Sequence, residues 1–338
     1  TIRDVARHAG VSVATASRVL SESNYPVSNR MRTKVLRAVQ DMDYVVNAHA
    51  RALSGVRPKM VAIVSGSMSS PFYSDIAQGV TDEAAANDRL CMYTSNRGSA
   101  ESELAIVSLM REQQADAVIL IGGVVPTEEY AERMTRYTES LAAAGSRLVL
   151  CGRPGLGIDI GAFVVSYDNA DGAFAITSHL ATHGHRRILH LAGNEGNTTA
   201  TDRIAGYRRA IAAHNIDDDP GLVEYGRFKR DSGYERMRRR LERRRDFTAV
   251  FGADDTVAAG AMRAMAEAGL RVPQDVSVVG YNDCSPSLDL TPALTTVHIP
   301  AGELGRAAVR LALAERPAER QVTLGTHIVV RESVASPP

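Results

Sequence analysis

The sequence predicts a small all-α head with a helix-turn-helix pattern, followed by a larger α/β domain of two doubly wound lobes. Apolar residues recur at helical spacing in the first 42 residues, whereas from residue 60 short β-rich runs alternate with amphipathic helical stretches. Such alternation predicts parallel sheets that helices cover on both faces. A chain of 338 residues also exceeds the size of one compact core, which favours several domains.

The head begins with two short predicted helices around a glycine turn. Thr1 and Asp4 hold the positions of a capping box, Gly10 breaks the first helix, and the second can be capped by Ser12. The apolar stripes expected in the core are Ile2, Val5, Ala6 and Ala9, then Ala16, Val19 and Leu20. The outer face of the second helix carries Val13, Ala14, Ser17 and Arg18. Small residues followed by an arginine suit a helix in the major groove of DNA, although a surface helical hairpin is the alternative.

A third helix and a short helical turn complete the predicted head. Ser28 is the expected cap of the third helix, whose apolar stripe is Met31, Val35, Leu36, Val39 and Met42. Residues 47–55 predict one or two helical turns that are too short to be stable alone. The basic linker 56–59 follows, and its proline ends any helix.

Strand and helix patterns alternate through the rest of the chain. Short apolar runs predict strands at 60–66, 90–95, 117–122, 147–151, 163–166, 187–192, 222–225, 248–252 and 276–281. Amphipathic stretches predict helices near 73–88, 100–114 and 128–144. Ligands of doubly wound sheets bind beyond the carboxyl ends of the strands, so residues that follow a strand are the candidates for a site.

Charge is distributed unevenly between head and body. The whole chain carries 39 basic and 39 acidic residues, but residues 1–59 contain ten Lys and Arg against four Asp and Glu. The rest of the chain therefore carries 29 basic and 35 acidic residues. Because only the head has excess positive charge, only the head is expected to bind a polyanion such as DNA.

Four motifs occur in order within the first 59 residues. They are Thr1-Ile-Arg-Asp-Val-Ala, Ala9-Gly-Val-Ser, Ala14-Thr-Ala-Ser-Arg-Val-Leu20 and Asn47-x-x-Ala-Arg-x-Leu53. Through these motifs the chain resembles the lactose-repressor (LacI/GalR) family of bacterial transcription regulators. The resemblance implies a DNA-binding domain at 1–46, a hinge helix and linker at 47–59, and an effector-binding and dimerisation domain at 60–338.

The same resemblance assigns roles within the head. Val13, Ala14 and Arg18 would read bases in the major groove. Leu53 would wedge into the minor groove at the centre of a palindromic operator, beside its twin from a second subunit. The complete set of implied DNA-binding residues is Thr1, Ser12, Val13, Ala14, Thr15, Ser17, Arg18, Asn24, Asn47, Ala50 and Leu53.

The resemblance extends to the body, because the family's effector domain is shaped like a periplasmic sugar-binding protein. It implies a first lobe of about 60–162 and 293–321, and a second lobe of about 163–292 and 322–338. The small-molecule effector would bind in the cleft between them.

Candidate effector-binding residues follow the predicted strands. Phe72 and Tyr73 can stack on a sugar or a base, or pack between the lobes. Asp168 can face a ligand or cap the next helix. By resemblance, the ligand-binding positions of the second lobe are Arg203, Phe228, Asp254 and Asn282. Asn282 departs from the acidic residue often seen in the family, which leaves Asp254 as the carboxylate of that pair.

Other charged segments favour structural explanations. In the basic segment 236–245, Met237 and Leu241 lie four residues apart, which predicts an amphipathic helix with a solvated face. No metal site is predicted, because metal-ligand spacing is absent among His183, His185 and His190. No nucleophile–base arrangement or phosphate loop stands out, so neither an enzyme nor a bound cofactor is expected.

The expected location follows from cysteine use and hydropathy. Cys91, Cys151 and Cys284 are widely spaced and have apolar neighbours, which predicts buried thiols in a reducing compartment. The sequence has no apolar run of transmembrane length. We therefore expect a cytoplasmic, nucleoid-associated protein that does not bind membranes.

Together these features predict a sequence-specific repressor that binds double-stranded operator DNA as a homodimer under the control of a small effector. A sugar or sugar derivative is favoured as effector, and a purine-type corepressor is an open alternative. A solute-binding protein associated with transport is the rival class, and a sugar-converting enzyme is a third alternative. Dimer and tetramer both stay open as assemblies, as do induction and corepression as responses.

Overall fold

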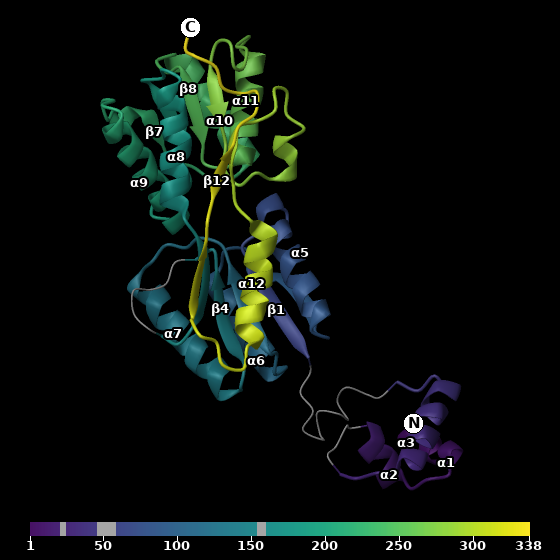
Figure 1. Cartoon of the computed structure of the whole chain (residues 1–338). Coiled ribbons are helices and arrows are strands. Elements are labelled where there is room, and N and C mark those ends of the chain that lie inside the picture. The colour runs from purple at the N-terminus through teal and green to yellow at the C-terminus, as the bar shows by residue number, and fades with distance from the viewer. Residues whose placement is uncertain (21–24, 46–58, 154–159) are drawn as a thin grey trace. The chain divides into compact units, whose positions relative to one another are not determined.

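The computed structural model describes residues 1–20, 25–45, 59–153 and 160–338, apart from the side chain of Pro286. The chain divides into a small unit, Thr1–Lys59, which we call the head, and a large unit that holds nearly all residues from Met60 to Pro338, which we call the body (Figure 1). The predicted hinge helix, with Asn47, Ala50 and Leu53, lies outside the described residues, as does Asn24.

The described head is the predicted three-helix unit. Its helices are α1 (Ile2–Ala9), α2 (Val13–Leu20) and α3 (Asn29–Asp41). Gly10 ends α1 with φ of 64°, a left-handed conformation that costs glycine little. Ser28 caps α3 by accepting a hydrogen bond from the Met31 backbone N–H. The core is formed by Val5, Ala6, Ala9, Ala16, Val19, Val35 and Ala38.

Two details of the head differ from the prediction. Thr1 does not cap α1 with its side chain, because its hydroxyl instead donates to the Asp4 carboxylate at 2.6 Å. Met31 and Leu36 of α3, and Met42 directly after it, remain exposed rather than closing the core. The small core of alanines and valines is already filled by Val35 and its neighbour Ala38, so the longer side chains stay outside.

The first lobe of the body is built on a parallel sheet in the order β11-β5-β4-β3-β1-β2. Its strands are β1 (Met60–Ser65), β2 (Leu90–Ser95), β3 (Ala117–Ile121), β4 (Arg147–Cys151), β5 (Phe163–Tyr167) and β11 (Gln321–Leu324). Helices α5 (Pro71–Ala86) and α12 (Ala301–Leu313) cover one face, and α6 (Ala100–Glu112) and α7 (Glu128–Ala143) cover the other (Figure 1). The alternation in the sequence therefore predicted this layered arrangement correctly.

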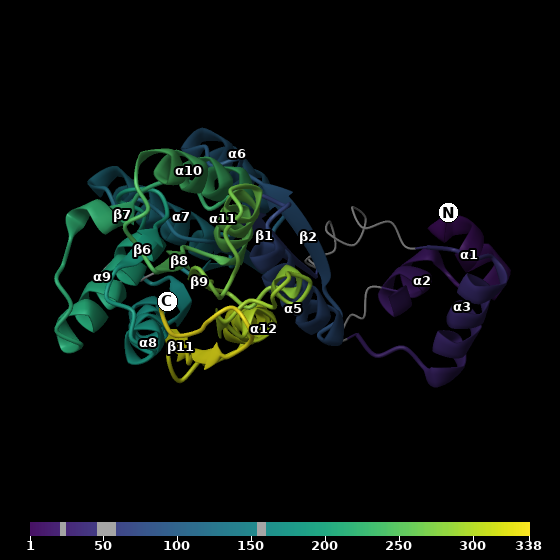
Figure 2. The ribbon, with the colours of Figure 1, turned by 90° about the horizontal axis from the view of Figure 1, so that it is seen from above.

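The second lobe is a smaller parallel sheet in the order β7-β6-β8-β9. Its strands are β6 (Ile188–Leu191), β7 (Val223–Glu224), β8 (Ala249–Gly252) and β9 (Ser277–Val279). Helices α8 (Asn169–Thr182) and α9 (Thr198–Ala213) pack as one pair and α10 (Arg230–Arg243) and α11 (Asp255–Glu267) as another, on opposite sides of the sheet (Figure 2). Two 3₁₀ helices, Pro220–Leu222 and Ser285–Ser287, complete the elements of this lobe.

The predicted lobe boundaries are wrong at two strands. β5 was assigned to the second lobe, but it pairs with β4 on one side and β11 on the other, in the first sheet. β11 extends to Leu324 and belongs to the same sheet, three residues past the predicted boundary at 321. The buried side chains of β5 account for this placement, because they pack against α12 of the first lobe.

Two short strands connect the lobes. β10 (Thr296–His298) pairs with β12 (His327–Val329) in an antiparallel ladder. The Gly280 backbone N–H donates to the Thr295 carbonyl, so the start of this connection lies along the second sheet and not in the first lobe as predicted. The last residues, near Ser333, run beside β9 as expected, with the Val278 N–H donating to the Ser333 carbonyl.

Charged and thiol side chains of the body depart partly from expectation. The basic helix α10 buries Met237 as predicted, but Arg236 and Arg240 are also buried. Arg236 donates to the carbonyls of Ala192 and Glu224, because burial requires a guanidinium to find acceptors. Cys151 and Cys284 are buried free thiols, and Cys91 is partly buried. Within the described ranges, no helix has the length and hydropathy needed to cross a bilayer.

Candidate functional site

Arg203 is the centre of a polar cluster at the carboxyl ends of the strands of the second lobe. Its side chain, on α9, is only 2% exposed. Nε donates to Asn169 Oδ1 at 2.9 Å, and Nη2 donates to Asn282 Oδ1 at 3.0 Å. Nη1 donates to the backbone carbonyl of Ala253, directly after β8. The guanidinium is therefore fixed by three neutral acceptors from three different segments.

Aromatic rings cover the Arg203 guanidinium. Its carbon lies 3.6 Å from the centroid of Tyr281 and 6.0 Å from that of Phe228, which are cation–π distances. The Phe228 ring packs against Gly193, where an added Cβ would lie 2.2 Å from the ring. Glycine at this position therefore allows the ring to approach the strand end. No ion pair to Arg203 occurs among the described residues, so this cation is buried without a carboxylate at contact distance.

Asp254 lies near this cation and caps α11. Its Oδ1 accepts hydrogen bonds from the Val257 backbone N–H and the Thr256 hydroxyl, both at 2.8 Å. Burial raises the pKa of the Asp254 carboxyl, while those hydrogen bonds and the charge of Arg203 oppose the rise. The structure thus puts the predicted site residue Asp254 near Arg203. The same carboxylate has a structural role as the cap of α11.

Asn282 adopts a backbone conformation that few residues other than glycine tolerate. Its φ is 103°, and that of the next residue, Asp283, is 56°. The Asp283 carboxylate holds this turn by accepting from Arg331 at 2.6 Å and pairing with His298 at 2.9 Å. The turn directs the Asn282 side-chain oxygen to Arg203.

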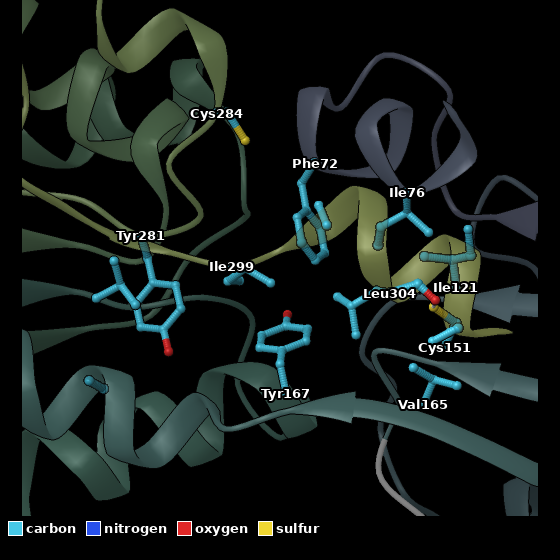
Figure 3. Close-up of a cluster of buried hydrophobic side chains, with 14 of the residues drawn as sticks. Phe72, Ile76, Ile121, Cys151, Val165, Tyr167, Tyr281, Cys284, Ile299 and Leu304 are labelled. Atoms are coloured by element: carbon cyan, nitrogen blue, oxygen red, sulfur yellow. Dashed lines mark hydrogen bonds between the residues drawn. The ribbon is translucent and has the colours of Figure 1, made fainter. Parts of the chain in front are cut away.

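Phe72 and Tyr73 lie where α5 begins in the first lobe. Phe72 is 7% exposed and packs edge-on against Tyr167, with ring centroids 5.8 Å apart. Figure 3 shows Phe72, Tyr167 and Tyr281 around Ile299, so residues from both lobes meet here. Burial, followed by the proximity of Tyr167, raises the pKa of the Tyr73 phenol to about 12. Because the Phe72 ring is buried against Tyr167, it has the packing role that the sequence analysis gave as the alternative to ligand stacking.

Asp168 also fills its structural alternative. It precedes α8 and accepts a hydrogen bond from the Asp171 backbone N–H at 2.7 Å, so it is a helix cap. Of the predicted set, the structure groups Arg203, Phe228 and Asn282 by direct contact, with Asp254 close to them.

Sequence reasoning missed several members of this cluster. Tyr167, Asn169 and Tyr281 were not singled out, although each flanks a predicted residue at a strand end. It also missed a direct contact between the lobes: the Thr198 N–H donates to the Val124 carbonyl at 2.8 Å, and the Val124 N–H donates to Thr198 Oγ1 at 3.1 Å. This contact joins segments 74 residues apart, and local patterns carry no signal of it.

The predicted DNA-reading helix has the expected faces. Val13, Ala14 and Arg18 are exposed on α2, while Ala16 and Val19 are buried. The Ser12 side chain caps the helix by accepting from the Thr15 backbone N–H at 3.1 Å, and its hydroxyl lies 2.9 Å from that of Thr15. Ser17 is half-buried and Thr1 is exposed. The Arg18 guanidinium lies 4.3 Å from the centroid of the exposed Tyr25 ring.

Comparison with known proteins gives the family of this chain. Residues 1–47 match the model of bacterial regulatory proteins of the lacI family, and residues 177–334 match a periplasmic-binding-protein-like domain. The chain is 34% identical to the transcriptional regulator CelR of Thermobifida fusca, over 98% of each chain. It belongs to the LacI family. GalR of Escherichia coli is 31% identical over 100% of this chain and 96% of its own, and PurR of Haemophilus influenzae is 28% identical over 99% of each.

Solved structures of family members share the whole fold. The CelR–cellobiose complex has a TM-score of 0.72 and 32% identity, covering 98% of this chain and 99% of that one. The Lac repressor dimer bound to operator and the anti-inducer ONPF has a TM-score of 0.86 and 25% identity, covering 99% of both chains. The predicted family, fold class and general function are therefore confirmed. This LacI family member is a helix-turn-helix transcription regulator whose body is a periplasmic-binding-protein-like domain.

Proposed function

We propose that this LacI family member is a repressor that a sugar-like effector controls by binding at the Arg203 cluster, between the two lobes. The supporting observation is the buried guanidinium of Arg203, which has only neutral acceptors among the described residues. Asp254 and Asn282 lie beside it, so donors and acceptors of hydroxyl groups are close together. Phe228 and Tyr73 add aromatic surface on which a sugar ring can stack.

The proposed DNA contacts use the outer face of α2. Val13, Ala14 and Arg18 read bases in the major groove, and Ser12, Thr15, Ser17 and Thr1 position the helix on the phosphates. The remaining proposed contacts, Asn24, Asn47, Ala50 and Leu53, belong to segments outside the described ranges. The domain limits 1–46, 47–59 and 60–338 stay part of this proposal.

A homodimer on a near-palindromic operator is the proposed assembly, because each head reads one half-site. Of the two solved structures above, the Lac repressor has the higher TM-score, and it is described as a dimer on its operator. In this chain β2 lies at the edge of the first sheet, and Leu90 and Met92 on it are 77% and 41% exposed. Exposed apolar side chains on a sheet edge support association of two bodies.

Effector binding is proposed to act through linkage. An effector that binds one arrangement of the lobes better favours that arrangement, and so raises or lowers operator affinity. A purine corepressor is the second candidate, supported by the aromatic residues Phe228 and Tyr73 and by the similarity to PurR. We further propose that the protein has no catalytic activity, since its relatives are transcription regulators. It acts on DNA in the cytoplasm and, in this proposal, associates with the nucleoid.

The test begins with a thermal-shift screen of the purified chain against sugars, sugar phosphates, polyols and purines. Each stabilising compound is then tested for its effect on binding to duplexes selected from a random DNA pool. A sugar that changes DNA affinity supports the proposal, and a purine that does so supports the corepressor alternative. Residues 60–338 alone should bind the same compound but no DNA. Stabilisation by neither class would contradict the proposed ligand.

A further inference from the structure

A second set of buried polar side chains lies in the first lobe and shares no residue with the Arg203 cluster. It consists of Glu103 on α6, Tyr130, Arg133 and Tyr137 on α7, and Arg153 after β4, which we call the α6–α7 polar cluster. Glu103, Tyr130, Tyr137 and Arg153 are at most 4% exposed. Only the Arg133 side chain, 21% exposed, reaches the surface to any extent. Charged side chains are rarely so buried unless their charges are balanced.

The charges of the α6–α7 polar cluster do not balance. Arg153 Nη2 lies 3.2 Å from Glu103 Oε2, and Arg133 Nε lies 3.6 Å from Glu103 Oε1. A neutral amide, Asn96 Nδ2, also donates to Glu103 Oε2 at 2.9 Å. One carboxylate thus faces two guanidiniums, that of the buried Arg153 and that of the partly exposed Arg133. One positive charge is therefore left without a counter-ion among the described residues.

Hydrogen bonds in the cluster are also incomplete. Across the described residues, six of its buried polar atoms have no hydrogen-bond partner: Glu103 Oε1, Tyr130 OH, Tyr137 OH, Arg133 Nε, and Arg153 Nε and Nη1. Five of these atoms can donate, but Glu103 Oε1 can only accept. The two phenol oxygens can also accept, and Tyr130 lies close to Arg153. The five donor atoms still outnumber the three acceptor atoms, and each buried donor left unpaired is destabilising.

The phenols are suited to act as donors. Burial raises the pKa of the Tyr137 phenol to about 12, and it raises the pKa of the Tyr130 phenol as well. Both therefore keep their protons at neutral pH. Tyr130 also lies in the first turn of α7, which begins at Glu128, and the positive end of the helix dipole favours a negative charge nearby.

We propose that the α6–α7 polar cluster binds a small inorganic anion, of the size of chloride or phosphate, between α6, α7 and the residue after β4. Such an anion supplies an acceptor and cancels the excess charge, whereas a water molecule forms hydrogen bonds but carries no charge. The limited exposure of the cluster excludes larger organic anions. Bound there, the anion ties together two helices and the sheet of the first lobe.

The test compares thermal unfolding of the full chain in sodium chloride, sodium phosphate and sodium gluconate at equal ionic strength. Gluconate is the anion that is too large for the site. The variants are Tyr137→Phe and Tyr130→Phe, each of which removes one donor and keeps the ring. Tyr225→Phe is the matched control, since that phenol is 45% exposed in the second lobe. General salt effects on stability are shared by all four proteins and cancel in the comparison.

We expect the wild type and Tyr225→Phe to be more stable in chloride or phosphate than in gluconate. An anion at about ten times its Kd raises the folded-to-unfolded ratio about tenfold. Tyr137→Phe and Tyr130→Phe should lose most of this gain. The proposal is overturned if both variants respond to the anions as the wild type does. It is also overturned if they gain stability equally in all three salts, because removing a hydroxyl that lacks a partner is stabilising.

Discussion

The replacement of Arg203 by methionine tests whether the guanidinium organises the second lobe. Methionine keeps an apolar stem of similar length, but it leaves Asn169 Oδ1, Asn282 Oδ1 and the Ala253 carbonyl without their donor. Hydrogen bonds to a charged donor contribute about 1.5–3 kcal/mol each, so the loss is at most roughly 5–9 kcal/mol. Relief from burying an unpaired cation offsets several kcal/mol of this loss. We expect a net destabilisation of about 2–4 kcal/mol.

The matched control is Arg209→Met, one helical turn and a half further along α9. Arg209 is half-exposed and pairs with the exposed Asp171, so its loss should cost less than about 1 kcal/mol. The assay is urea unfolding of both variants and the wild type, followed by circular dichroism. Equal free energies of unfolding for the two variants would refute the argument that the Arg203 hydrogen bonds hold this part of the body. A compound from the thermal-shift screen that still stabilised Arg203→Met would remove Arg203 from the effector site.

Three further predictions concern packing, pH and DNA. Gly206→Ala should destabilise the body by about 1–3 kcal/mol in urea unfolding, because an added Cβ would lie 2.1 Å from the Ala170 carbonyl oxygen. Gly325→Ala, with open space around it, should cost less and serves as the control. Burial lowers the pKa of His190 to about 3, below its unfolded value near 6.5. Below pH 6.5 the unfolded chain therefore binds more protons at this residue than the folded chain does, so the free energy of unfolding falls as the pH drops. The contribution of His190 to the slope of the free energy of unfolding against pH is at most about 1.4 kcal/mol per pH unit. His190→Phe should therefore flatten this pH dependence, measured between pH 7.5 and 5.5. An unchanged pH dependence in the variant would contradict the lowered pKa. Arg18→Ala should weaken binding to a selected operator by about 1–3 kcal/mol and reduce base discrimination. A variant that prefers the cognate over a scrambled duplex as strongly as the wild type does would contradict that role.

The sequence by itself determined the head and the layered plan of the body. Gly10, Ser12 and Ser28 mark helix ends through local chemistry, and each ends or caps a helix in the structure. The strands of the body were predicted because their apolar runs are local as well. Arg203, Phe228 and Asn282 could be placed at one site through the family pattern, and the structure brings them into contact.

Only the tertiary structure decided which segments meet. β5 belongs to the first sheet because of its pairing with β4 and β11, and β11 lies more than 150 residues away in the chain. Local patterns also did not distinguish the two roles of Asp168, which became a helix cap, or bring Tyr281 onto Arg203. The burial of Glu103 with two arginines was equally hidden, because each charge by itself is typical of an exposed helix or loop. Periodicity in a sequence reflects the environment of one element, whereas pairing, charge balance and close approach depend on elements that the fold brings together.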